Sequence, residues 1–517
     1  MNQGRRGLFI KNAFILTGSA MLLRLLGMFY QIYMSNRIGA AGMGLYQLIH
    51  SVYILFVNLA TSGITIAVTR LIAENMERGG RRAANRVLRR ALLISGTLSI
   101  AGALFLLFGA DLVASVFLKD LRSAPALRIL APSLPLVGVS CCLRGYFTAR
   151  RKVSVSSNAQ IFEQLVRIAI GVTLLNLFAD KGLLYACAAV VIGNTVSEVA
   201  CCSFMLIGFM LDRKRFAETG NGQLIVKKSV TGQILAIAAP IAAIGCLNTL
   251  LRTIENLLVP NCLTKYTHSR ERSLAEFGML KGMAMPLLFF PSSFLAALAT
   301  LLVPEIAEAY TSHKQERLNR MITTSMHITI ASSILIGGIF FLFSTELGVL
   351  IYKSEEVGFL LRVLAPIMPF MYLESIADGI LKGLNQQVSS LKYSVADSVI
   401  RIAMIFLLVP VEGMKGFLLV MVVSNLFTAF MNVRRLLHVT GLKIQWGKWV
   451  LKPGAAMVFS GIVTVALCKV VLRGALPAFA SVLLGILTAA VLYCGVLLLT
   501  GCVTISELAA FRRAKRS

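Results

Sequence analysis

The sequence predicts an all-α polytopic membrane protein with about fourteen transmembrane helices, arranged as two pseudo-symmetric six-helix lobes plus two C-terminal helices. Three observations predict this class. Of the 517 residues, 57% are hydrophobic and only 14% are charged, and the mean hydropathy is +0.78. Apolar runs of helix length recur along the chain, and one half repeats the other. A soluble domain carries roughly a quarter charged residues, which excludes a water-soluble enzyme.

Each predicted span is an apolar run bounded by charged residues or by Gly and Pro. A bilayer core needs about 20 apolar residues per helix, and lipid offers the backbone no hydrogen-bond partner, so such runs form helices. The first lobe holds residues 12–35, 44–69, 91–110, 125–147, 157–178 and 183–211. The second holds residues 232–263, 278–303, 321–343, 357–381, 390–410 and 416–433, and the last two spans are 450–471 and 476–500.

The basic residues predict the orientation, because cytoplasmic loops retain Lys and Arg. With the N-terminus inside, 32 of the 51 Lys and Arg fall in inner segments and 11 in outer loops. We therefore expect a multi-pass protein of the cytoplasmic membrane with both termini cytoplasmic. The formal charge of +28 is distributed over many short loops, which favours contact with anionic membrane lipids and excludes a nucleic-acid footprint.

An internal repeat divides the chain at a fixed offset of 234 residues. Residues 127–132 (LRILAP) recur as 361–366 (LRVLAP), and at the same offset Gly182 meets Gly416. We therefore predict a lobe over 1–228, a second over 229–440, and two further helices with a basic cytoplasmic tail over 441–517. Each lobe has an even number of spans, so the pseudo-two-fold axis runs along the membrane normal and the substrate site lies between the lobes.

Charged residues inside spans mark the candidate binding site. A charge at mid-bilayer costs roughly 2.5–3.5 kcal/mol on insertion scales, so it faces protein or a cavity. Arg24 in the first span corresponds to Arg252 in the seventh, and a pair of guanidinium groups suits phosphate oxygens. Alternatively each arginine is paired locally, with Glu255 available to Arg252. His50 and Lys281 are further binding candidates.

Two other sets of charges predict different roles. Glu163 with Arg167, and Asp397 with Arg401, are i, i+4 pairs at matching places in the two lobes, and we interpret them as structural ion pairs. Glu374 and Asp378 in the tenth span are candidates for ion coupling, although a packed polar seam explains them equally well.

We expect no cofactor and no metal site. The ten cysteines lie almost entirely in apolar stretches and never in C-x-x-C spacing. No G-x-x-x-x-G-K-[ST] motif is present, so the chain does not hydrolyse ATP through a P-loop.

Four features of the sequence form a recognisable set. They are Arg24 in the first helix, then Ile38-Gly39-Ala40-Ala41-Gly42-Met43-Gly44-Leu45-Tyr46-Gln47, then Phe290-Pro291-Ser292, and then Leu302-Val303-Pro304-Glu305-Ile306. Together they resemble the polysaccharide-exporter branch of the MOP flippase superfamily. The resemblance covers all fourteen spans, and the last two motifs are shared with lipid II flippases. Two positions depart from those flippases: Tyr46 replaces an acidic residue and Pro286 an arginine, so of that cationic set only Arg24 is shared.

The resemblance implies a MATE- and MurJ-like, two-lobed transporter that acts by alternating access. Its substrate would be an undecaprenyl-diphosphate-linked saccharide, a lipid II-like peptidoglycan precursor, for spore cortex synthesis, and cell-wall synthesis enzymes would be its partners. Two other classes stay open: a MATE-like cation-coupled exporter of small molecules, and a scaffold for cell-wall enzymes that transports nothing. A site for cationic drugs needs carboxylates in the central cleft, and spans 1, 2 and 8 have no Asp or Glu at mid-membrane.

Overall fold

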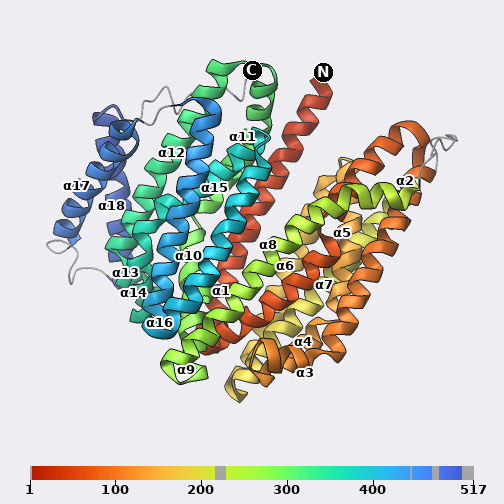
Figure 1. Ribbon diagram of the computed structural model, residues 1–517, viewed down its shortest axis with the longest axis horizontal. Coiled ribbons are helices and arrows are strands. Elements are labelled where there is room, and N and C mark those ends of the chain that lie inside the picture. Colours follow the sequence, from red (N-terminus) through yellow and green to blue (C-terminus); the bar gives the residue numbers. More distant parts are fainter. Residues whose placement is uncertain (1–2, 216–228, 443–444, 469–476, 503–517) are drawn as a thin grey trace. The chain divides into compact units, whose positions relative to one another are not determined.

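The protein is helical throughout the part that the structure describes. This computed structural model (Figure 1) describes residues 3–215, 229–442, 445–468 and 477–502, and within these ranges it contains helices and no strand. The chain divides by packing into two compact units, Met1–Gly278 and Met279–Ser517, called unit 1 and unit 2 below.

Unit 1 consists mainly of long helices, with several short helices between them. Its elements are α1 (Gln3–Thr61), α2 (Ile64–Phe108), α3 (Ala110–Leu112), the π-helix η1 (Val113–Phe117), the 3₁₀-helix η2 (Leu121–Ser123), α4 (Ala124–Leu130), α5 (Ser133–Ala149), α6 (Val153–Phe178), the 3₁₀-helix η3 (Ala179–Lys181), α7 (Leu183–Arg215), α8 (Val230–Thr267) and α9 (Arg270–Gly278).

Unit 2 has a similar sequence of elements. They are the π-helix η5 (Met279–Ala284), α10 (Met285–Phe289), α11 (Ser292–Thr311), α12 (Gln315–Leu342), α13 (Ser344–Tyr352), α14 (Glu355–Leu364), the 3₁₀-helix η6 (Ala365–Ile367), α15 (Met368–Gly383), α16 (Gln387–Thr440), the π-helix η7 (Gly447–Leu451), α17 (Lys452–Leu467) and α18 (Ala478–Leu499).

Fewer separate spans are present than the fourteen predicted. Among the described residues, ten helices are long and apolar enough to cross a membrane, or eleven if α4 and α5, bent by 42°, count as one. Two helices each contain two predicted spans, because α1 and α16 bend at Gly39 (φ 72°) and Gly413 (φ 60°). The predicted span 278–303 falls on the shorter elements η5, α10 and α11. The count of fourteen therefore stays a prediction.

The sequence repeat reappears in the bounds of the helices. Helix α2 ends at Phe108 and α12 at Leu342, and α6 begins at Val153 and α16 at Gln387, so both pairs keep the offset of 234. The repeated proline at 132 falls in the break between α4 and α5, and the one at 366 falls in the short 3₁₀-helix η6 between α14 and α15. Both positions interrupt the α-helix, since a proline ring cannot donate a backbone hydrogen bond. The repeated stretches therefore fold alike.

The packing division and the repeat division do not coincide. Helices α8 and α9, which the repeat assigns to a second lobe beginning at residue 229, pack against α1 and α2 within unit 1. The lobes 1–228 and 229–440 are defined by duplication rather than packing, so they remain a prediction. The loop 216–228 and the basic tail 503–517 lie outside the described residues.

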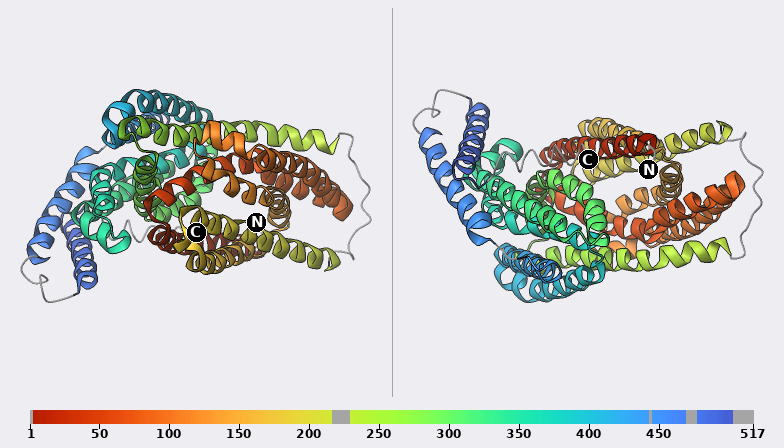
Figure 2. Two further views of the ribbon diagram at one scale, coloured as in Figure 1. Left: turned by 90° about the horizontal axis from the view of Figure 1, so that it is seen from below. Right: turned by 90° about the horizontal axis from the view of Figure 1, so that it is seen from above.

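Within unit 2, the last two helices pack against α12. Helices α17 and α18 lie side by side (Figure 2), and both contact α12. Tyr493 on α18 is buried and its hydroxyl donates to the carbonyl of Ala331 on α12 at 2.8 Å. This buried hydrogen bond joins the additional pair of helices to the repeated part of the chain.

One end of unit 1 is held by a buried carboxylate. Asp212 on α7 accepts hydrogen bonds from Tyr146 at 2.7 Å, from Arg150, and from Lys152. The donors lie at the end of α5 and in the following turn, so the contacts tie that turn to α7. This end carries the basic cluster 150–152 that the charge pattern assigns to the cytoplasmic side.

Candidate functional site

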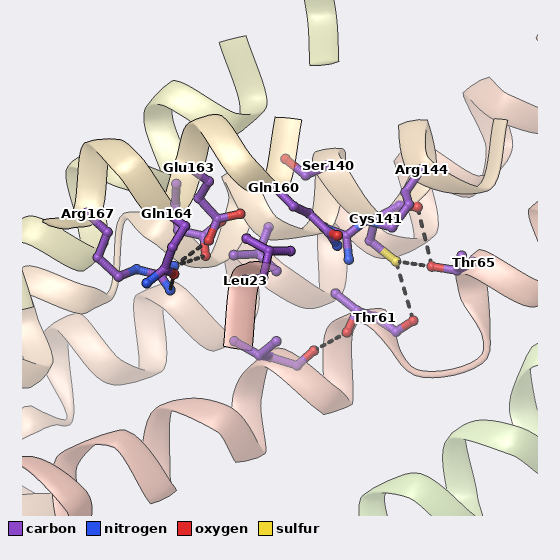
Figure 3. Close-up of a pocket in the computed structure, with 13 residues that line it drawn as sticks. Leu23, Thr61, Thr65, Ser140, Cys141, Arg144, Gln160, Glu163, Gln164 and Arg167 are labelled. Atoms are coloured by element: carbon purple, nitrogen blue, oxygen red, sulfur yellow. Dashed lines mark hydrogen bonds and ion pairs between the residues drawn. The ribbon is translucent and has the colours of Figure 1, made fainter. Parts of the chain in front are cut away.

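A cavity of about 440 Å³ lies inside unit 1, among α1, α2, α5, α6 and α7 (Figure 3). Four charged side chains line it: Arg144 from α5, Glu163 and Arg167 from α6, and Glu198 from α7. The other lining residues are Leu23, Val57, Thr61, Thr65, Val137, Ser140, Cys141, Gln160 and Gln164. The cavity is therefore largely polar within helices whose outer faces are apolar.

Arg167 is the centre of the hydrogen-bond network at this cavity. It pairs with Glu163 one turn earlier, and its Nη2 lies 3.8 Å from Oε1 of Glu198. Its Nε donates to the hydroxyl of Ser197 at 3.2 Å, and its Nη1 donates to the Oε1 of Gln164 at 3.2 Å. One guanidinium thus joins α6 to α7 through charged and neutral acceptors.

Arg144 and Ser140 leave polar atoms at the cavity unsatisfied. The Nε of Arg144 and the Oγ of Ser140 are both buried without a hydrogen-bond partner. An unpaired buried donor costs about 1–3 kcal/mol, so such atoms in native proteins face water or a ligand. With two arginines and two glutamates, the lining charges balance, and the cavity suits water or a small polar group.

Unit 2 contains a similar cluster, whose ion pair occupies the repeated positions. Arg401 pairs with Asp397 at 2.7 Å, and its Nε donates to the hydroxyl of Ser424 at 3.0 Å. Ser424 in turn donates to Oδ1 of Asp397 at 2.6 Å. In unit 2 these side chains join the two helical halves of α16. In unit 1 side chains of the same types join α6 to α7. The contacts are present in both repeats, and their structural role stays a prediction.

The unit 2 cluster is more acidic than its counterpart. Glu374 on α15 lies close enough to Asp397, Arg401 and Thr428 to interact with them. Asp378, one turn later, accepts hydrogen bonds from Lys382 and Ser390. At an offset of 234 these acidic residues correspond to Ser140 and Arg144 of unit 1. Unit 1 thus carries an arginine where unit 2 carries an aspartate.

The predicted anion-binding arginines lie on exposed helix faces. Arg24 on α1 and Arg252 on α8 are both exposed, whereas Glu255 is only 5% exposed. Helices α1 and α8 pack together through polar contacts: Asn58 to Thr249 at 2.9 Å, and Asn256 to Ser51 at 2.9 Å. The binding roles of Arg24, Arg252 and Glu255 remain predictions.

His50 and Lys281 belong to different units. His50 lies between two aromatic rings on α1, with centroid distances of 5.7 Å to Tyr46 and 6.4 Å to Tyr53. Lys281, in η5 of unit 2, places its Nζ 5.8 Å from the ring centroid of Phe417. Each therefore has an aromatic environment of its own, and their assignment to substrate binding stays a prediction.

Sequence reasoning missed the contribution of Glu198 and Ser197. Glu198 is an acidic residue within the predicted span 183–211, and that position is the signal that identifies it. Its proximity to Arg167 depends on the packing of α6 against α7, which no local spacing reveals.

Among the described residues, no group of three or more His, Cys, Asp or Glu is placed to hold a metal ion.

Comparison with known sequences assigns the family. The profile of the polysaccharide biosynthesis protein family matches residues 9–310, more than half of the chain. The chain belongs to this family. Stage V sporulation protein B of Bacillus subtilis (strain 168) is 26% identical over 475 residues, which cover 90% of each chain.

Solved structures with the same fold include a lipid II flippase and a MATE family transporter of the MOP superfamily. The lipid II flippase MurJ, in an inward closed conformation, superposes with a TM-score of 0.68 at 13% identity, over 97% of this chain and 100% of that one. An inward-facing multidrug resistance MATE family transporter superposes with a TM-score of 0.66 at 16% identity, over 84% and 100%. The expected MATE- and MurJ-like all-α fold is confirmed.

Proposed function

We propose that this protein is a flippase for an undecaprenyl-diphosphate-linked saccharide, which it moves across the cytoplasmic membrane by alternating access. The observation that carries the proposal is Arg24, an exposed guanidinium on the first membrane helix, in a chain of this family and fold. Arg252 occupies the corresponding helix of the second repeat and is exposed in the same way.

The chemistry of the guanidinium group supports an anionic headgroup as the substrate. A guanidinium donates two parallel hydrogen bonds to phosphate oxygens. Keeping an arginine within a membrane span costs roughly 2.5–3.5 kcal/mol, and a recurring anionic ligand offsets this cost. The two arginines recur at matching places, as expected when two repeats contribute to one site.

The substrate class is supported by the relatives. One is named for sporulation stage V and another is named a lipid II flippase. We therefore infer a lipid II-like peptidoglycan precursor, used for the spore cortex, and cell-wall synthesis enzymes as partners that consume the exported headgroup. Anionic lipids would contact the basic inner loops.

The proposal is tested with proteoliposomes that contain a fluorescent lipid diphosphate saccharide. Wild-type protein should export the headgroup, and Arg24→Ala should abolish export. Arg24→Lys should restore only part of it, because an ammonium cannot make the planar two-point contact. Competition by unlabelled lipid diphosphate, but not by a neutral lipid, should slow export.

A matched control separates binding from folding. Arg70 is another arginine of unit 1, but its side chain is 66% exposed and is paired with Glu74 one turn away, so Arg70→Ala should transport normally. All variants should be recovered from membranes in equal amounts. Export by Arg24→Ala at the wild-type rate would remove the anion site from the proposal.

A second candidate function is MATE-like, cation-coupled export of small molecules. The observation in its favour is the pair of carboxylates, Glu163 and Glu198, at the unit 1 cavity. Arg144 and Arg167 balance their charge there, which disfavours a cationic drug as ligand. Transport of a cationic dye, with no response to lipid diphosphate, would establish this second function.

A third outcome is that the protein transports neither substrate but binds cell-wall enzymes. That result would instead establish a scaffold.

We infer further that the acidic cluster of unit 2 couples transport to a cation. Glu374 lies near both Asp397 and Asp378, and the cations in this cluster are Arg401, paired with Asp397, and Lys382, paired with Asp378. Binding a cation there would compensate the excess negative charge. Glu374→Gln should then remove any dependence of export on a sodium or proton gradient while leaving substrate binding intact.

A further inference from the structure

A second cavity, of about 450 Å³, lies at one end of unit 1. Its lining residues come from η1, from the turn that follows it, from η2 and from the start of α9: Ser115, Lys119, Asp120, Leu121, Arg122 and Arg270. Figure 1 shows α3, α4 and α9 at the same end of the unit. The charge pattern assigns these loops to the outer side of the membrane.

Three cationic side chains and one carboxylate line this cavity, and the carboxylate is already paired with one of the three cations. Asp120 accepts from the Nε of Arg122 at 2.9 Å, from its Nη2 at 2.7 Å and from its backbone N–H at 3.0 Å. Burial raises the pKa of Asp120, but the hydrogen bonds and charge of Arg122 outweigh burial and hold this pKa below its usual range. Asp120 is therefore ionised at neutral pH and forms an ion pair with Arg122.

Arg270 is held by neutral acceptors. Its Nη1 donates to Oδ1 of Asn261 at 3.1 Å and its Nη2 donates to the backbone carbonyl of Leu118, while its Nε is buried without a partner. Burial lowers the pKa of Arg270 despite the nearby charge of Asp120. Neutral acceptors orient a guanidinium but do not neutralise its charge, and this arrangement is costly unless an anion completes it.

The surrounding charges leave an excess of positive charge. Lys119 is exposed and has a positive φ of 50°, and it lies beside Arg122 and Arg270 in the lining. Glu271, exposed on the first turn of α9, interacts with Arg122 from outside the lining. Even with Glu271 included, three cations face two carboxylates.

We propose that Lys119, Arg122 and Arg270 form an oxyanion-binding site at the outer end of unit 1, which takes a phosphate or diphosphate group. A water occupies about 30 Å³ of liquid, so the cavity has room for a diphosphate with its hydration. The site is separate from the flippase site proposed at Arg24 and does not depend on it. Its ligand is either a phosphate group of a lipid headgroup or a phosphate dissolved outside the cell.

The test is a calorimetric titration of inorganic pyrophosphate into the full-length protein in nanodiscs of phosphatidylcholine. The protein carries Arg24→Ala and Arg252→Ala, so that the proposed flippase site does not contribute. This background should bind pyrophosphate, and adding Arg270→Gln or Lys119→Gln should weaken binding at least tenfold. Arg272→Gln is the matched control, because Arg272 is 73% exposed and paired with Glu276, and it should change the affinity less than twofold.

A second arm identifies the source of the phosphate. In nanodiscs that contain phosphatidylglycerol, weaker apparent binding of pyrophosphate shows that a lipid phosphate occupies the site, and unchanged binding shows that the ligand is a soluble phosphate. Arg270→Lys serves if Arg270→Gln fails to fold, as judged by gel filtration. The proposal is overturned if the background protein binds no pyrophosphate in phosphatidylcholine, or if Arg272→Gln weakens binding as much as Lys119→Gln does.

Discussion

At the scale of single residues, Arg167 shows how an intramembrane charge is accommodated. It contacts two carboxylates, Glu163 and Glu198, and two neutral acceptors, Ser197 and Gln164. A charge with this many partners loses much of its desolvation penalty through hydrogen bonds. A similar arrangement of Arg401, Asp397 and Ser424 in unit 2 indicates that both repeats stabilise an intramembrane arginine in this way.

Removing Arg167 alone should cost more stability than removing Arg167 together with Glu163. Arg167→Gln leaves two carboxylates uncompensated, so we expect a loss on the order of 2 kcal/mol, below the roughly 3–5 kcal/mol of a fully buried pair. Glu163→Gln should be milder because Glu198 remains near Arg167. The double variant Glu163→Gln with Arg167→Gln should be milder than Arg167→Gln alone. The measurement is the unfolding temperature in detergent at one scan rate.

The control for this prediction is an exposed pair with the same spacing. Arg70 and Glu74 are an i, i+4 pair with side chains 66% and 51% exposed. Arg70→Gln should leave the unfolding temperature almost unchanged, because exposed pairs contribute about 0–1 kcal/mol. A double variant at Glu163 and Arg167 that is less stable than Arg167→Gln alone would contradict the account.

At the scale of helices, Gly44 explains part of the motif at residues 38–47. A Cβ on Gly44 would lie 2.0 Å from the carbonyl oxygen of Leu274 on α9, and a Cβ on Gly278 would lie 2.0 Å from the carbonyl oxygen of Ala40 on α1. The obstacles are backbone atoms, which cannot rotate away. Glycine at both positions therefore lets α1 and α9 approach closely, as small residues do between membrane helices.

We predict that Gly44→Ala separates α1 from α9 and destabilises the protein by about 1–3 kcal/mol, the usual cost of an overpacked contact. The measurement is again the unfolding temperature, together with the yield of folded protein. Gly18→Ala on the same helix is the control, because a Cβ there meets nothing within 4 Å, and it should be neutral or slightly stabilising. Equal stability of the two variants would show that the close approach does not constrain the helices.

At the scale of the whole molecule, the topology is a prediction with a direct test. A reporter fused after Arg215 should be cytoplasmic, and a reporter at Ser269 should be external, because the positive charges concentrate in the loops assigned to the inside. Helix α8 separates these two positions. An external signal from the loop at residues 213–228 would overturn both the fourteen-span topology and the outer placement of the oxyanion site.

Energy for export should come in part from the membrane potential. Moving one negative charge outward across an inside-negative membrane is favourable by about 2.3 kcal/mol per 100 mV, so a doubly charged diphosphate gains about 4.6 kcal/mol. Collapsing the potential with valinomycin and external potassium should slow headgroup export in proteoliposomes. Equal rates with and without a potential, in the absence of ion gradients, would leave facilitated equilibration as the mechanism.

Alternating access by rocking of residues 1–228 against 229–440 is the conformational part of the same proposal. A site that binds the headgroup well must also open to release it. Cysteines placed near Arg24 in a cysteine-depleted background should react with an external reagent only in the outward-open state. Constant labelling under conditions that trap opposite states would contradict rocking of the two lobes.

The sequence by itself determined the properties that depend on local composition and spacing. Apolar runs of about 20 residues determine membrane helices, because lipid leaves the backbone no other way to satisfy its hydrogen bonds. The i, i+4 spacing of Glu163 with Arg167, and of Asp397 with Arg401, brings each pair together on one helix face. The offset of 234 predicted that the two halves fold alike, and the ends of α2 and α12 share that offset.

Only the tertiary structure decided which helices meet. Glu198 and Ser197 join Arg167 because α7 packs on α6, and Arg270 reaches Leu118 although 152 residues separate them. Packing also places α8 and α9 with unit 1, although the repeat assigns them to the second lobe. The physical reason is that contacts between helices depend on which faces fit closely, as at Gly44 and Leu274, and periodicity along one helix does not specify its neighbour.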